Sequence, residues 1–104
     1  MTIVDRFIKY ARIDTQSDEN STQTPSTLKQ FNLAKEVEKE AIEMGLVDVS
    51  LDNNCYLMAT LPSNTSKKVP VIGFLSHFDT SPDMSGNNVN PRIVKNYDGK
   101  DIIL

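Results

Sequence analysis

Apolar residues near the start of the chain recur with the period of a helix. Over residues 2–12 the apolar side chains fall at intervals of three and four positions: Ile3, Val4, Phe7, Ile8 and Ala11. Thr2, followed three residues later by Asp5, provides the side chains of a capping box in which Asp replaces the usual Glu. The pattern therefore predicts an amphipathic helix whose apolar stripe faces a core.

A second helical pattern follows a polar stretch. Residues 14–24 contain no apolar side chain, which favours a solvated loop or linker over a segment that contacts a substrate. Thr24, Pro25 and Ser26 then supply a helix start, and Gly45 supplies a left-handed stop. Between them the apolar residues line one face: Leu28, Phe31, Ala34, Val37, Ala41 and Ile42. The charged residues of this helix lie mostly on the other face and are expected to be solvated.

The second half of the chain has the patterns of strands. Apolar and polar residues alternate over residues 47–51, and a second strand is predicted over residues 56–61. Residues 69–76 form a nearly continuous apolar run, which is typical of a strand buried on both faces. Two short strands are predicted at residues 93–94 and 102–104. This order predicts an α/β layer with a mixed sheet, residues 69–76 at its centre and a ligand site beyond their carboxyl end.

Composition narrows the class of protein. The chain has 104 residues, of which 38% are hydrophobic, and carries 11 Lys and Arg against 14 Asp and Glu. This length predicts one domain, and no apolar run is long enough for a transmembrane helix. The net charge of -3 and the lack of a basic block argue against a nucleic-acid partner. Since Cys55 is the single cysteine, an internal disulfide is excluded, and a cytoplasmic protein without nucleic-acid or membrane partners is predicted.

The chemically distinctive residues stand at the end of the predicted central strand. His77 is the only histidine, and Asp79 follows two positions later. Because residues two apart in a strand point to the same side, Asp79 can accept a hydrogen bond from one imidazole nitrogen. The other nitrogen, held in one tautomer, is then free to bind a metal or to move a proton.

Spacing alone leaves the role of this pair open. A zinc-ligating His77, a general base and a histidine merely hydrogen-bonded at a strand end all agree with it. A phosphate-accepting Asp79 ranks lower, because the segment has no glycine cradle and no acidic cluster with a lysine. Cys55 is more simply a packed side chain than a nucleophile partnered with His77. Residues 83–90 are interpreted as a plain surface turn beside the pair.

A longer string around the pair resembles a known motif. Residues 73–83 read Gly-Phe-Leu-Ser-His-Phe-Asp-Thr-Ser-Pro-Asp. This string resembles the first metal motif of the di-zinc metallopeptidase family, which also holds carboxypeptidase- and deacylase-type enzymes. The extended form Ser-His-x-Asp-Thr-Ser-Pro-Asp is similar to that of the tripeptide aminopeptidases of the family. Further similar strings occur through nearly the whole chain, at residues 14–17, 25–27, 43–46, 57–62 and 88–91.

The resemblance implies a fold and an activity. The fold is a three-layer α/β zinc-peptidase catalytic domain, and the activity is removal of the amino-terminal residue from tripeptides. His77 matches the first zinc-ligating histidine of the family. Asp79 matches the aspartate that orients this histidine and is counted as catalytic. Two zinc ions are implied for the full-length enzyme, in which a metal-bound water, activated by a glutamate, attacks the peptide carbonyl.

The resemblance also implies that much of the family's site is missing. Family members are several hundred residues long, and their lid domain and remaining metal ligands lie downstream of the stretch that matches. Residues 1–104 are therefore expected to be the amino-terminal part of a truncated catalytic domain. A catalytic zinc takes about three protein ligands, so the chain alone, with His77, is expected to be inactive and to bind zinc weakly.

A function of another class is a non-catalytic α/β module that binds a partner or assembles with itself. An incomplete sheet leaves an unpaired edge and apolar surface, and both favour homo-oligomers.

Overall fold

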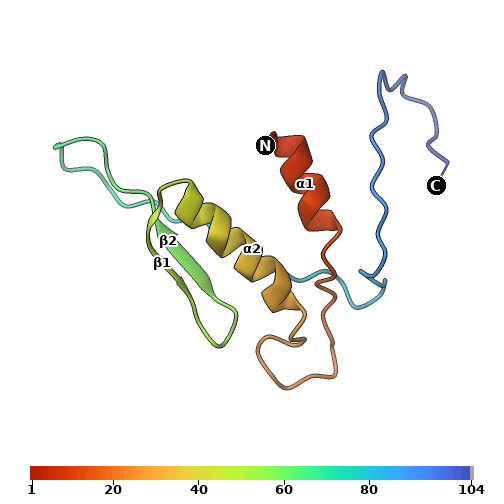
Figure 1. Ribbon diagram of the computed structural model, residues 1–104, viewed down its shortest axis with the longest axis horizontal. Coiled ribbons are helices and arrows are strands. Elements are labelled where there is room, and N and C mark those ends of the chain that lie inside the picture. Colours follow the sequence, from red (N-terminus) through yellow and green to blue (C-terminus); the bar gives the residue numbers. More distant parts are fainter. Residues whose placement is uncertain (104) are drawn as a thin grey trace.

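The described part of the chain folds into two helices and one short hairpin (Figure 1). A computed structural model describes residues 1–103. Its elements follow in the order α1 (Ile3–Ala11), α2 (Gln30–Glu43), β1 (Val47–Leu51) and β2 (Leu57–Thr60). This small α/β arrangement is compatible with part of a peptidase domain, while the three-layer architecture stays a prediction. Neither of the described helices is long and apolar enough to cross a membrane.

α1 begins as the sequence predicts, but its apolar stripe is open. Thr2 Oγ1 accepts a hydrogen bond from the backbone N–H of Asp5 at 3.1 Å, and the Asp5 carboxylate accepts one from the backbone N–H of Thr2 at 3.0 Å. This capping box satisfies N–H groups that have no partner inside the helix. Ile3 is 83% exposed and Phe7 is 70% exposed. The prediction of a core-facing stripe is therefore wrong for Ile3 and Phe7, while Ile8 and Ala11 of the same stripe are half-buried.

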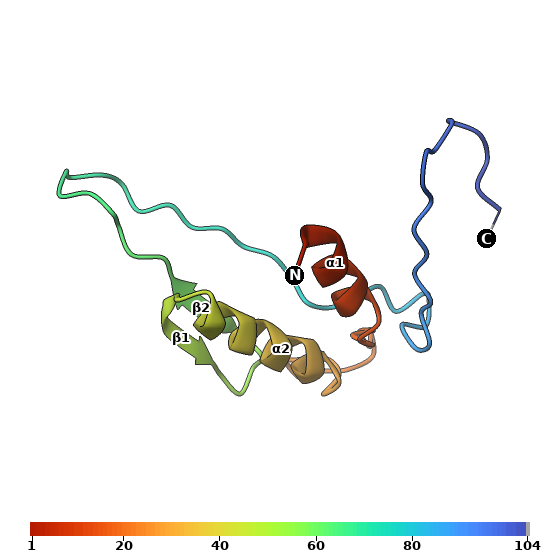
Figure 2. The ribbon, with the colours of Figure 1, turned by 45° about the horizontal axis from the view of Figure 1, so that its top comes forward.

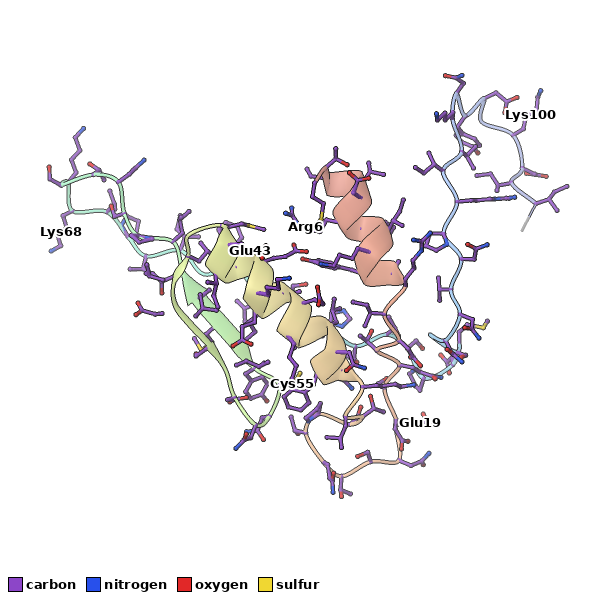
Figure 3. All side chains as sticks on the ribbon, in the orientation of Figure 1. Arg6, Glu19, Glu43, Cys55, Lys68 and Lys100 are labelled. Atoms are coloured by element: carbon purple, nitrogen blue, oxygen red, sulfur yellow. The ribbon has the colours of Figure 1, made fainter. Side chains whose placement is uncertain are left out.

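A buried carboxylate joins α1 to α2. Glu40 on α2 is only 4% exposed, and Figure 3 shows Arg6 on the side of α1 that faces α2. Glu40 accepts hydrogen bonds from three side chains of α1: the Tyr10 hydroxyl at 2.7 Å, Arg6 Nε at 2.7 Å and Lys9 Nζ at 3.0 Å. These donors, Tyr10 first, lower the pKa of Glu40 to about 2. The prediction of a solvated charged face is thus wrong at Glu40, because α1 covers it.

α2 begins later than predicted and ends as predicted. Residues 25–29 form bends and turns, and the helix starts at Gln30. The Ser26 hydroxyl accepts hydrogen bonds from the backbone N–H of Asp18 and from Gln30 Nε2, each at 3.1 Å. Because this hydroxyl binds the preceding loop and a side chain, it does not cap a helix at Ser26. Gly45, two residues past the end of α2, has a φ of +85° and makes the left-handed stop.

α2 packs on the hairpin (Figure 2). β1 and β2 pair in an antiparallel sheet with Leu51 opposite Leu57, which confirms the two strands predicted here. Asp52 closes the turn by accepting hydrogen bonds from the backbone N–H groups of Asn54 and Tyr56, each at 2.9 Å. The small core is made by apolar residues of α2 and of the hairpin turn: Leu33, Ala34, Ala41 and Cys55.

The segment predicted as the central strand is open and extended. Residues 69–76 pair with no described strand, and Figure 2 shows this part of the chain returning from the loop beyond β2 toward α1. Val71 is fully exposed, and Phe74 and Leu75 are each 96% exposed. The prediction of a buried strand on which α2 packs is therefore wrong for the described residues. A strand buried on both faces needs bonded neighbours and covering layers, and the described hairpin pairs only with itself.

The two short strands predicted near the end are not formed either. Residues 93–94 and 102–103 have no ladder partner in the described part of the chain, and Leu104 lies outside it. Within residues 1–103 the sheet is accordingly antiparallel and not mixed. The radius of gyration is 17.1 Å, whereas a compact domain of this size has about 13 Å. The molecule is thus open around its small core.

Candidate functional site

The structure brings His77 and Asp79 together, as their spacing predicts. His77 Nδ1 lies 3.0 Å from Asp79 Oδ1. The side chain of His77 is 80% exposed, and that of Asp79 is 42% exposed. A carboxylate at Nδ1 favours the tautomer with the proton on that nitrogen, which leaves the Nε2 lone pair for a ligand in the solvent. A metal-ligating histidine with an orienting carboxylate uses this arrangement, and so does a general base.

A loop from the first part of the chain holds the residue after this pair. The backbone N–H of Thr80 donates to the Thr15 carbonyl at 3.1 Å, and the backbone N–H of Ser17 donates to the Thr80 carbonyl at 3.0 Å. These bonds make an isolated parallel bridge between Gln16 and Thr80. The polar stretch that predicted a solvated loop therefore packs, at its start, against the segment of the candidate site.

A charged group fixes this loop in turn. Asp14 accepts hydrogen bonds from the backbone N–H of Gln16 at 3.0 Å and from Lys29 Nζ at 2.9 Å. Both donors, the backbone group first, hold the pKa of Asp14 below its usual range. The sequence predicts no contact for this loop, since its side chains show no apolar period. The feature of the sequence that indicates such a contact is a run of hydroxyl, amide and carboxyl side chains, which can form hydrogen bonds with backbone groups of another segment.

An apolar hollow opens near the candidate site. It has a volume of about 490 Å³ and lies between α1 and residues 78–89. Phe7 lines it from α1, and Phe78 and Met84 line it from the other side. Residues 83–90, interpreted from the sequence as a plain surface turn, thus border a recess.

The described residues fit one position of a metal site and not a complete one. Among residues 1–103 no group of three or more His, Cys, Asp or Glu side chains could hold a metal ion. Asp83 accepts a hydrogen bond from the Ser81 hydroxyl at 3.0 Å. A catalytic zinc takes about three protein ligands. The imidazole of His77, oriented by the carboxylate of Asp79, suits one such ligand. The described residues therefore fit one ligand of a metal site and leave its other ligands unassigned.

Cys55 does not add to this chemistry. Its side chain is buried at the hairpin turn, beside the start of α2 (Figure 3). Burial, with a smaller effect of Asp52, raises the pKa of the thiol, and a protonated thiol is a poor nucleophile. The interpretation of Cys55 as a packed side chain agrees with this burial.

Comparison with known proteins identifies what the chain is similar to. No family model matches it. It is 60% identical over 102 residues to peptidase T of Clostridium acetobutylicum. Peptidase T of Clostridium novyi is 57% identical, and that of Bacillus licheniformis is 56% identical, each over 102 residues.

The chain resembles peptidase T over nearly its whole length. Each of these alignments covers 98% of the chain and 25% of the relative. The chain thus spans about a quarter of the length of the curated relatives it matches. The resemblance stated from residues 73–83 and from the strings spread along the chain is confirmed and narrowed to peptidase T.

Proposed function

We propose that the chain provides the first metal ligand of a zinc-dependent aminopeptidase that acts on tripeptides in the cytoplasm. The observation that carries the proposal is the 3.0 Å contact between His77 Nδ1 and Asp79 Oδ1, with the imidazole open to solvent. The identity of 55–60% to proteins named peptidase T supports peptide hydrolysis as the activity.

His77 and Asp79 have separate roles in this proposal. The carboxylate of Asp79 accepts a hydrogen bond from the Nδ1–H group of His77. This bond fixes the tautomer and directs the Nε2 lone pair toward the solvent. His77 is therefore the metal ligand, and Asp79 is the residue that orients it. Zinc, when bound, polarises the peptide carbonyl and lowers the pKa of a bound water.

The remaining ligands are proposed to come from the longer peptidase. Residues 1–104 would then form the amino-terminal part of the catalytic domain, and the rest of that domain and the lid domain would supply the other positions of a two-zinc site. Since His77 is the only histidine of this chain, the 104-residue chain by itself is expected to be inactive.

Two preparations test the function. The purified 104-residue chain, with and without zinc, is expected to show no tripeptide hydrolysis above background. A protein that continues in the same reading frame to the length of the relatives is expected to hydrolyse tripeptides, and His77→Ala should abolish this activity. Turnover by the 104-residue chain that is lost in His77→Ala would contradict the proposal. So would full activity of the longer protein with His77→Ala.

One observation favours a second function, self-association through strand pairing. Residues 69–76 are extended and exposed, with Val71, Phe74 and Leu75 almost completely open to solvent. An extended segment with unpaired backbone groups can pair with the same segment of a second copy. Size-exclusion chromatography with light scattering separates the monomer from the dimer. If this function holds, Phe74→Lys should shift the chain to the monomer, and Phe31→Lys, on α2, serves as a control outside the segment.

A further inference from the structure

Side chains of residues 14–17, here called the 14–17 loop, reinforce the backbone bridge to the candidate site. The Ser17 hydroxyl donates to the Thr80 carbonyl at 2.8 Å, and the same carbonyl accepts the backbone N–H of Ser17. Gln16 Nε2 donates to the Pro82 carbonyl at 2.9 Å. The loop therefore forms hydrogen bonds with the backbone of the residues that follow Asp79.

The 14–17 loop is itself tied to the start of α2. The Thr27 hydroxyl donates to the Gln16 carbonyl at 2.8 Å, and Lys29 Nζ lies 2.9 Å from Asp14 Oδ2. Thr15 is only 2% exposed. Because α2 is the helix that packs on the hairpin, these contacts connect the candidate site to the core.

Gly86 marks where the next loop closes on the 14–17 loop. A Cβ atom at Gly86 would lie 2.6 Å from Asp14 Oδ1 and 3.3 Å from Asp14 Cγ. The carboxylate cannot move aside without losing its hydrogen bonds from Gln16 and Lys29. Only a residue without a side chain fits there, so the fit of this loop depends on glycine.

We propose that the 14–17 loop positions the His77–Asp79 pair, with Gln16 and Ser17 as positioning residues; this rests on the proposed role of the pair. Fixing both the N–H and the carbonyl of Thr80 sets the direction of the extended backbone just before it. That direction decides whether residues 77 and 79 share a side. The loop bonds the backbone of Thr80 and Pro82, and it therefore supports the Asp79 carboxylate through the chain next to it.

Nuclear magnetic resonance of the imidazole tests the proposal on the full 104-residue chain. His77 is the only histidine, so its ring nitrogen signals are unambiguous. The Nδ1 and Nε2 frequencies of the ring report which of the two nitrogens carries the proton. The chain unfolded in urea provides the frequencies of an unrestrained ring. We expect Gln16→Ala and Ser17→Ala to shift both signals toward the unfolded values.

Matched variants separate positioning from a general loss of structure. Gln23→Ala and Ser21→Ala make the same changes in the same polar stretch, away from Thr80, and should leave the ring signals unchanged. Ser17→Thr keeps the hydroxyl and should restore the signals of the unmodified chain. Ring signals that stay unchanged in Gln16→Ala and Ser17→Ala would overturn the proposal. Equal shifts in the control variants would also overturn it.

A substitution at Gly86 provides an independent test of the proposal. Gly86→Ala should shift the ring signals because its methyl group displaces the Asp14 carboxylate, and this shift should be smaller when Asp14→Ala is already present. Equal shifts with and without Asp14→Ala would contradict the close contact between Gly86 and the Asp14 carboxylate.

Zinc added in excess to the unmodified chain tests the ligand role separately. A shift of the Nε2 signal is expected if this nitrogen binds zinc. If zinc causes no shift, His77 is not a zinc ligand in this chain. The result for the loop variants is independent of this outcome, because those variants are measured without zinc.

Discussion

At the scale of single residues, the His77–Asp79 pair combines a fixed orientation with open access. The contact of 3.0 Å sets the ring, while 80% exposure leaves its other nitrogen in water. Orientation of one ligand is not sufficient for tight metal binding, because affinity follows the number of preorganised ligands. Under the proposed function, the pair supplies one oriented ligand and needs further ligands to complete a site.

Zinc titration by calorimetry measures this directly. We expect the 104-residue chain to bind zinc weakly, with a Kd above the micromolar range, because water would fill most of the coordination sphere. His77→Ala should remove even this binding, and Asp83→Asn should leave it unchanged. A stoichiometric site of sub-micromolar affinity that disappears in His77→Ala would mean that further ligands come from this chain or from a second copy.

Glu40 predicts a pH dependence at the same scale. Its pKa is lowered to about 2 in the folded chain by Tyr10, Lys9 and Arg6, from an ordinary 4.5. A carboxyl group with a lowered folded pKa stabilises the fold above its unfolded pKa, and this stability is lost as the pH falls through the folded value. Stability is therefore expected to decline between pH 4.5 and about 2.

Glu40→Gln should flatten this decline. Because the amide does not titrate, the free energy of unfolding of the variant, followed by urea denaturation, should depend less on pH in that window. Glu43→Gln is the matched control on α2, since Glu43 is 62% exposed and lies 3.9 Å from Lys39. A variant Glu40→Gln with the unmodified pH profile would show that this carboxylate does not stabilise the junction of α1 and α2.

At the scale of elements, α1 depends on its amino-terminal cap and on charged contacts with α2. It buries none of its residues, so a packed apolar face does not stabilise it. Its helix is supported by the capping box of Thr2 and Asp5 and by the bonds to Glu40. Short helices without packed faces are marginal in water, and α1 should therefore be the first helix to open.

Thr2→Ala should lower the stability of α1 by about 1 kcal/mol, since it removes the side chain of the N-cap. Hydrogen exchange of the α1 amides is expected to become roughly fivefold faster, while the amides of α2 keep their rates. Thr65→Ala, in an exposed loop, is the control. Unchanged exchange in α1 of the Thr2→Ala variant would show that the contacts with α2 hold this helix without the cap.

The elements that the sequence predicts correctly are those set by local rules. Capping by Thr2, the stop at Gly45 and the alternation over residues 47–51 act within a few neighbouring positions. The burial of residues 69–76 was a prediction of another kind, because a central strand requires partners elsewhere in the chain. The contacts of the 14–17 loop with Thr80 were missed for the same reason, since polar bonds between distant segments leave no period in the sequence.

At the scale of the whole molecule, the openness of the chain is measurable. Small-angle X-ray scattering of the monomer at low concentration is expected to give a radius of gyration near 17.1 Å. A compact domain of this length would give about 13 Å. The compact value would mean that residues 69–76 fold back onto the hairpin or α2, contrary to the structure. Unfolding in urea provides the expanded reference on the same sample.

The bridge between Gln16 and Thr80 has a consequence for the order of folding. The bond from Ser17 to Thr80 joins residues 63 positions apart, whereas the hairpin joins Leu51 to its near neighbour Leu57. Closing a chain loop ten times longer costs about 2 kcal/mol more in entropy. The hairpin and α2 are therefore expected to form first, and the extended segment that carries His77 is expected to join them last. Synthesis from the amino terminus would reinforce this order of folding, because Thr80 leaves the ribosome long after the 14–17 loop to which it bonds.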